Sequence, residues 1–231
     1  MKIVEIAILI IILLGALIGF KKGAIKEIFE LVGTVSIIII SYLLKGYLAN
    51  ALIKFLPFFN FKGYVGLYSI NFIIYDVISF IIIFILLYCV LNILLDLAGF
   101  IDKLINLSVI FALPSKIIGL VLGMVNSLIF VFLLCYIAMQ IPYTQKYVME
   151  SSLSTKILER TPIVNVVCSK GILVGEDVYN KLSNYSFKEE DTQDMNLQIA
   201  TSVAKYGLVD KVRIQEAINA GKLNLEHVII A

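Results

Sequence analysis

Histidine is almost absent from this chain of 231 residues, which contains one, His227, and no tryptophan. A Ser–His–Asp or Cys–His arrangement needs a histidine beside its nucleophile, whereas His227 lies in a short apolar segment. The motifs GxSxG, GxxxxGK[ST], GxGxxG and HExxH are missing as well. These absences argue against catalysis and against a histidine metal site. We therefore expect a protein that is not an enzyme and that binds no cofactor and no metal.

Cysteine is also sparse, with Cys89 and Cys135 inside apolar stretches and Cys168 beyond them. An odd, scattered set supplies neither a disulfide framework nor the CxxC spacing of a zinc site. We expect all three to be buried as small hydrophobic side chains.

Charge is the third scarcity, because 16% of the residues are charged and 60% are hydrophobic, against about a quarter charged in soluble domains. The net charge of +2 divides into +5 over residues 1–175 and −3 over residues 176–231, which leaves no basic surface for nucleic acid. A soluble fold needs polar surface that the first 140 residues lack. The expected partner is therefore the lipid bilayer.

Long apolar runs are what the chain has in place of charge. At about 1.5 Å of rise per residue, four of them are long enough to cross a bilayer. They cover Ile3–Phe20, about 28–44, about 69–95 and about 113–139. The second is the shortest, with Lys45 at its exit. The first is not a cleaved signal peptide, because its basic cluster follows the apolar run. The expected fold is all-α, an integral membrane bundle of four transmembrane helices with a small helical C-terminal extension.

The chain divides into a four-span membrane domain (1–145), a juxtamembrane helical segment (146–187) and a small polar helical tail (188–231). In the juxtamembrane segment we expect a helix over 163–170 that ends at Gly171. In the tail, Gly207 and Gly221 each follow a helical pattern. The tail is too short for a large core of its own, so it docks on the membrane domain, on a second copy in a homo-oligomer, or on a partner.

The segment between the second and third spans is rich in aromatic residues from Phe55 to Tyr68. Aromatic rings favour the headgroup level of a bilayer, so this segment either lies along the membrane interface or packs as a loop over the bundle.

Lys21, Lys22 and Lys26 form a dense basic cluster in the tight hairpin that joins the first two spans. Lysines near span ends favour the cytoplasmic side of a membrane. The hairpin loop is therefore expected in the cytoplasm, with both termini extracytoplasmic.

Small and polar residues mark where the spans meet. Close helix packing is expected at two GxxxG stretches and one further glycine: Gly15, Gly19, Gly119, Gly123 and Gly33. Glu5, Asp76 and Asn126 are intramembrane polar residues that could share a pocket for a proton or a solute. The alternative is structural, with Glu5 reaching the interface and the asparagines bonding between helices.

The stretch from Glu5 to the turn Gly19-Phe20-Lys21-Lys22-Gly23, followed by Gly33, resembles the opening of the bacterial colicin V production protein family. The run from Pro114 to Gly119 and Gly123 is similar to that family's proline-to-glycine stretch. The resemblance covers about residues 1–165.

The resemblance implies a multi-pass protein of the bacterial cytoplasmic (inner) membrane with a role in toxin production or export and in envelope homeostasis. Its expected function is a non-enzymatic accessory one, with an unidentified membrane or envelope protein as partner. The competing interpretation is a subunit of a small-solute or ion channel or transporter, which the polar residues Glu5, Asp76 and Asn126 favour.

Overall fold

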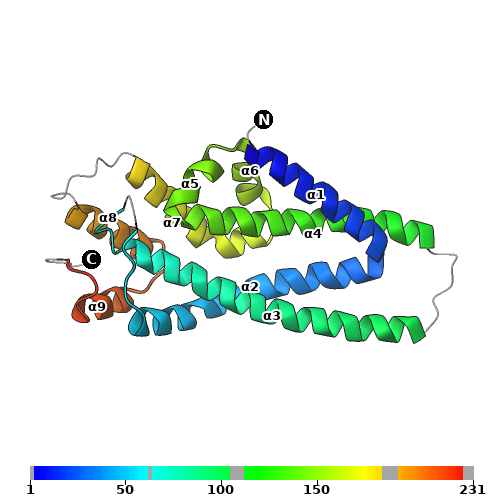
Figure 1. Ribbon diagram of the computed structural model, residues 1–231, viewed down its shortest axis with the longest axis horizontal. Coiled ribbons are helices and arrows are strands. Elements are labelled where there is room, and N and C mark those ends of the chain that lie inside the picture. Colours follow the sequence, from blue (N-terminus) through cyan, green and yellow to red (C-terminus); the bar gives the residue numbers. More distant parts are fainter. Residues whose placement is uncertain (1–2, 62–63, 105–111, 184–191, 226–231) are drawn as a thin grey trace.

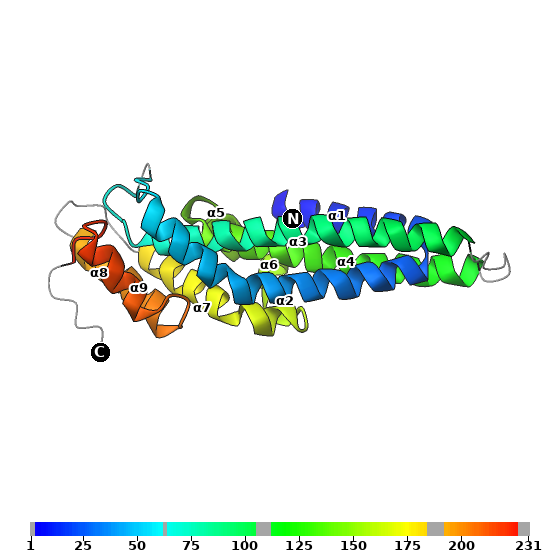
Figure 2. The same cartoon turned by 90° about the horizontal axis from the view of Figure 1, so that it is seen from below.

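The computed structural model describes residues 3–61, 64–104, 112–183 and 192–225. The helices within these residues are α1 (Ile3–Lys22), α2 (Ala24–Phe55), α3 (Ile70–Leu104), α4 (Ala112–Gln140), α5 (Pro142–Met149), α6 (Ser152–Arg160), α7 (Val164–Ser183), α8 (Thr192–Lys205) and α9 (Lys211–Asn219). Helices α1 to α4 are long and apolar enough to cross a membrane, which confirms the predicted all-α, multi-pass fold. They form an elongated bundle, and α8 and α9 lie at the end opposite the α1–α2 turn (Figures 1 and 2).

A single residue, Gly23, separates α1 from α2. Its φ of +81° lies in the left-handed region, where a side chain would be strained and glycine is not. The next residue, Ala24, donates its backbone N–H to Oγ of Ser115 at 3.1 Å. That bond satisfies one of the free N–H groups at the start of α2 and joins the turn to α4.

The two GxxxG stretches face each other where α1 packs along α4 (Figure 1). A methyl group added to Gly19 would lie 2.2 Å from the carbonyl oxygen of Gly119, and one on Gly123 would lie 2.4 Å from that of Gly15. These are backbone contacts that no side chain can relieve. Gly33 of α2 differs, since the nearest atom to an added methyl is Cδ1 of Leu91, at 2.6 Å.

Helix α2 has 32 residues, so the expectation of a short second span over about 28–44 is wrong. Lys45 does not end the helix: its charge is paired with Asp76, and α2 continues past it to Phe55. The helix stops before Pro57, which disfavours helical backbone at Leu56, and Leu56 is extended (φ −99°, ψ 149°).

Lys222, a residue that follows α9, caps the far end of α2. Its ammonium group donates hydrogen bonds to the carbonyl oxygens of Ile53 (2.5 Å), Lys54 (2.8 Å) and Leu56 (3.0 Å). A cation at a helix C-terminus also interacts favourably with the helix dipole. The end of α2 is thus completed by a residue far away in the sequence.

The described part of the aromatic segment packs as a loop over the bundle, the second of the two arrangements considered above. The ring of Phe58 meets that of Phe72 edge-on, with centroids 5.5 Å apart. The hydroxyl of Tyr75 donates to the carbonyl oxygen of Pro57, and the backbone N–H of Phe59 donates to Oδ1 of Asn71 at 2.7 Å. The loop is therefore fixed to the start of α3.

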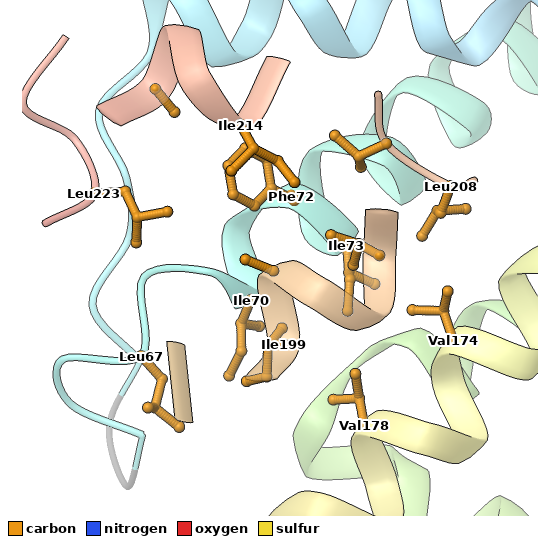
Figure 3. Packing of buried hydrophobic residues seen from close by; sticks show 14 of the residues in the cluster. Leu67, Ile70, Phe72, Ile73, Val174, Val178, Ile199, Leu208, Ile214 and Leu223 are labelled. Atoms are coloured by element: carbon orange, nitrogen blue, oxygen red, sulfur yellow. The ribbon is translucent and has the colours of Figure 1, made fainter. Parts of the chain in front are cut away.

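We call α7, α8 and α9 the extension helices; buried side chains of α8, α9 and the second half of α7 form one hydrophobic cluster with the start of α3 (Figure 3). Ile199 of α8, Ile73 of α3 and Val174 of α7 all belong to it. Of the docking surfaces considered for the tail, its own membrane domain is the one observed. The end of the tail, with His227, lies outside the described residues.

Helix α7 corrects one expectation, since it runs from Val164 through Gly171 to Ser183 rather than ending at Gly171. A methyl group on Gly171 would lie 2.3 Å from the hydroxyl of Tyr136, so this glycine serves close packing against α4. Gly207 and Gly221, by contrast, adopt positive φ after α8 and α9, as their patterns predict.

Cys135 and Cys168 are buried as expected, whereas Cys89 is exposed. Cys89 lies in the apolar part of α3, on a helix that crosses the membrane. In lipid an apolar side chain needs no protein to cover it, which is why the expectation fails there.

Candidate functional site

Glu5, Asp76 and Asn126, the three polar residues expected to form one pocket, lie apart in the structure. Asp76 and Asn126 line two different cavities, and Glu5, half-buried in the first turn of α1, lines neither. Asp76 faces α2, whereas α1 packs along α4. The structure therefore has two separate cavities instead of one shared pocket, and each is lined by charged residues that were not grouped from the sequence.

The first, which we call the bundle cavity, lies among α1, α2, α3 and α4 and has a volume of about 370 Å³. Its walls are mostly apolar, with Phe84 and Phe130 among them. Its residues with polar side chains are Lys22, Glu27, Glu30, Thr34, Tyr88, Asn126 and Ser127. It thus has the form of a ligand pocket, apolar with a few converging polar groups.

Two buried carboxylates and one ammonium group define the chemistry of the bundle cavity. Glu27 is 1% exposed and Glu30 is 7% exposed. The ammonium of Lys22 donates to Oε2 of Glu30 at 2.5 Å and lies 3.9 Å from Oε1 of Glu27. With both carboxylates ionised the group carries one net negative charge, which suits a small cation or a proton.

Two buried oxygen atoms of the bundle cavity are available as hydrogen-bond acceptors. Asn126 shares a hydrogen bond with the carboxylate of Glu27. Oε2 of Glu27 and Oγ1 of Thr34 are buried and have no hydrogen-bond partner among the described residues. Buried oxygens of this kind are acceptors for a cation or a proton donor.

The sequence contained a signal for this site. Glu27 and Glu30 are three residues apart and therefore lie on one face of α2, directly after the basic turn. Lys22 had been expected to act with Lys21 and Lys26 as a topology determinant. Lys21 and Lys26 are exposed, whereas Lys22 turns toward the two carboxylates.

The second cavity, which we call the junction cavity, has a volume of about 430 Å³ and lies between the bundle and the extension helices. From the bundle, Tyr42, Lys45 and Asp76 line it; from the extension side, Lys170 and Arg213 do. Neither part of the chain forms this cavity alone.

A buried ion pair forms the floor of the junction cavity. The ammonium of Lys45 donates to Oδ2 of Asp76 and lies 3.9 Å from the ring centroid of Tyr42. Lys45 and Asp76 are 5% and 2% exposed. Asp76 was expected from the sequence to be an intramembrane polar residue, whereas Lys45 was expected at the exit of the second span and not as its partner.

No group of three histidine, cysteine, aspartate or glutamate side chains in the described parts of the chain is arranged to hold a metal ion. The charged groups that line the two cavities are carboxylates, ammonium groups and one guanidinium, which are suited to binding ions or protons.

Comparison with known proteins gives one match. A family model described as colicin V production protein matches residues 4–162, which is more than half of the chain. The match contains the whole bundle cavity, whereas the extension helices lie beyond it. No curated protein and no solved structure matches the chain.

Proposed function

The chain belongs to the colicin V production protein family, and from that premise we propose that it acts as a non-enzymatic accessory protein in toxin production or export, within the bacterial cytoplasmic membrane. The observation that carries the proposal is the family match, which extends over all four membrane-crossing helices. Envelope homeostasis is the wider process in which such a protein takes part. Its partner is a membrane or envelope protein, or a second copy of the chain.

The docking of the extension helices supports an accessory role. The backbone N–H of Ser69 donates to Oδ1 of Asn196 at 2.8 Å, and Oγ of Ser69 donates to the carbonyl oxygen of Asn196 at 2.7 Å. Together with the Lys222 cap, these bonds fix the extension helices to one end of the bundle. A rigid polar platform beside a membrane bundle is suited to holding a partner.

Genetic complementation tests this proposal. In the bacterium that encodes the chain, disruption of the gene should reduce the toxin recovered from the medium, and the wild-type gene should restore it. Asn196→Ala, which loosens the platform, should restore less, whereas Gln198→Ala on the same helix should restore fully, because, among the described residues, the side chain of Gln198 bonds only to Asp194 within α8. Equal secretion with and without the gene would refute the proposed role.

Truncation is a blunter test than these substitutions. Removal of residues 176–231 would cut α7 in the middle and strip the hydrophobic cluster from the start of α3. A loss of function would then report unfolding as readily as a lost partner. Each variant should therefore be compared at equal abundance in the membrane fraction.

The second candidate function is a pathway for a proton or a small cation, favoured by the buried pair Glu27 and Glu30. Four spans are few for a transporter, so such a pathway would belong to an oligomer. Proteoliposomes with an internal pH-sensitive dye should show a proton flux that Glu27→Gln abolishes. Glu159→Gln, at an exposed position, is the matched control. Flux that is unchanged in Glu27→Gln removes this candidate.

We place the Gly23 turn in the cytoplasm and the extension helices outside. Two exposed positions report on this orientation, Ile25 beside the turn and Asn219 at the end of α9. With a membrane-impermeant maleimide on intact cells, Asn219→Cys should be labelled and Ile25→Cys should not. The reverse pattern would invert the orientation.

A further inference from the structure

Arg213 carries a buried positive charge whose ion pair with Asp210, among the described residues, is a long one. It is 8% exposed, and its Nη2 lies 3.8 Å from Oδ2 of Asp210, whose side chain is itself 82% exposed. Nε and Nη1 of Arg213 have no hydrogen-bond partner in the described part of the chain. A guanidinium stays charged at every physiological pH, so these donors call for an acceptor.

The surroundings of Arg213 place its charge at the junction cavity. The guanidinium lies against α2, since a methyl group on Gly46 would be 3.4 Å from Nη2. Both Arg213 and Gly46 line the junction cavity, next to Lys45. Arg213 therefore contributes its positive charge to the lining of this cavity.

The charges that line the junction cavity favour an anion. Lys45 and Asp76 neutralise each other through their ion pair. The remaining charged residues that line it are Arg213, Lys170 and the exposed Asp210, which together carry one net positive charge. A planar guanidinium and an ammonium group form a common combination for the oxygens of a phosphate.

We propose that the junction cavity is a phosphate-binding site in which Arg213, Lys170 and Lys45 are the cationic residues. The bound group is a phosphate oxyanion, which either a phospholipid headgroup or a soluble phosphate compound can supply. Asp210 lies at the exposed side of the site and restricts it to a group of low negative charge. The inference goes beyond the proposed accessory function and does not depend on it.

The depth of the cavity favours the lipid as the source. Lys45 lies 21 residues after Ala24 in one continuous helix, a rise of about 32 Å, which is close to the thickness of the hydrocarbon core. With the Gly23 turn at one surface of the membrane, the cavity lies at the headgroup level of the other. Leu43 and Val166 line the cavity and are exposed, so they offer apolar contacts beside the charged groups for an acyl chain.

The site is a property of the junction and not of the family unit alone. Residues 4–162 supply Lys45 and Asp76, whereas Lys170 and Arg213 lie beyond the match. The extension helices would thus add a binding site to one end of the four-span bundle.

The experiment uses the full chain in nanodiscs of phosphatidylcholine alone or mixed with phosphatidylglycerol. Lipid that stays bound is measured by native mass spectrometry, and thermal stability is measured with and without inorganic phosphate. We expect phosphatidylglycerol to be retained by the wild type and by the control Arg160→Gln, an exposed arginine. In Arg213→Gln, retention should fall about tenfold, the size expected for the loss of one charge-assisted interaction.

The remaining outcomes either support the phosphate-binding site or overturn it. A second outcome also supports the site. If phosphatidylglycerol is not retained, but inorganic phosphate stabilises the wild type in phosphatidylcholine nanodiscs and does not stabilise Arg213→Gln, the ligand is a soluble phosphate. If neither probe binds, or if Arg213→Gln binds as the wild type does, the proposal is wrong. Should Arg213→Gln fail to fold, Lys170→Gln replaces it, because Lys170 is exposed. Unchanged binding in that variant would overturn the proposal equally.

Discussion

The ammonium group of Lys45 on α2 donates a hydrogen bond to Oδ2 of Asp76 on α3, and both side chains are almost completely buried. This pair joins the two helices at the point where the junction cavity begins. Oδ1 of Asp76 has no hydrogen-bond partner among the residues described. The pair therefore connects α2 to α3, and each buried charge is neutralised by the other.

Removal of one partner of this pair should lower the free energy of unfolding more than removal of both partners. Asp76→Asn leaves the Lys45 charge buried and unpaired, which should lower the free energy of unfolding by about 3–5 kcal/mol. Lys45→Met combined with Asp76→Leu should recover most of that loss. Unfolding in mixed micelles, analysed as a double-mutant cycle, measures the coupling.

The control is the exposed pair Lys54–Glu216, at 3.3 Å with both side chains more than 40% exposed. Its coupling should be below about 1 kcal/mol. Equal coupling in the two pairs would show that burial does not strengthen the Lys45–Asp76 pair.

The glycines should respond to alanine according to what the added methyl meets. Gly19→Ala places it 2.2 Å from a backbone oxygen, so α1 must move away from α4, and we expect a loss of about 1–3 kcal/mol or more. Gly33→Ala should cost less, because the side chain of Leu91 can shift. Gly46→Ala, with 3.4 Å to a flexible arginine, should change stability by less than about 1 kcal/mol. Thermal unfolding in detergent gives this order, and a different order would contradict the α1–α4 contact.

Asn196 should control how firmly the extension helices stay docked. Its side chain accepts from Ser69 N–H and donates to the carbonyl oxygens of Gly66 (2.6 Å) and Thr192 (2.9 Å). Asn196→Ala leaves these buried groups unpaired, at a cost of about 1–3 kcal/mol. Hydrogen exchange over residues 192–205 should accelerate in that variant and not in Gln198→Ala. Equal protection in both variants would remove Asn196 from this role.

Cys168 should be inert in the folded protein. It is completely buried, and burial raises the pKa of its thiol to about 12, although the charge of Lys45 acts in the opposite direction. The thiolate is the reactive form, so maleimide should label an introduced Asn219→Cys quickly and Cys168 only after denaturation. The comparison needs a background with Cys89→Ala and Cys135→Ala. Fast labelling of Cys168 in the native protein would contradict the packing of α7.

The same thiol gives a pH dependence of stability. An unfolded cysteine ionises near pH 9, whereas folded Cys168 holds its proton to about pH 12. Stability from this group is therefore present below pH 9 and is lost as the pH rises toward 12. Over that range the wild type should lose stability faster than Cys168→Ala, as thermal unfolding at several pH values would reveal. Parallel loss in both proteins would contradict the raised pKa.

Hydropathy and turn chemistry predicted the fold well. The apolar run before Lys21 and the glycine after Lys22 were enough to predict the first helix and its tight turn. The bounds of α2 were missed because Lys45 reads as the end of a span when its partner is unknown. A charge can stay inside a bundle when another element brings a counter-charge to it, and pairing over 31 residues leaves no local pattern.

The candidate site was predictable only in part, for a similar reason. Asp76 and Asn126 are polar residues in apolar spans, so positions inside the bundle could be expected for them from the sequence. Their assignment to one pocket with Glu5 failed, since which faces of the helices meet is decided by packing. Gly171 shows the same limit, because a glycine that ends a helix and one that admits Tyr136 look alike in sequence.

The Lys222 cap on α2 has a consequence for the order of events during synthesis. Ribosomes build Lys222 166 residues after Leu56, whose carbonyl oxygen it caps. At the usual pace of translation this gap lasts roughly 10 to 30 s. During that time the second membrane helix has been synthesised, but its last carbonyl groups do not yet have their hydrogen bonds from Lys222. The maturation of an early helix thus waits for a late residue, and a ribosome that stalls before Lys222 leaves an inserted but unfinished protein.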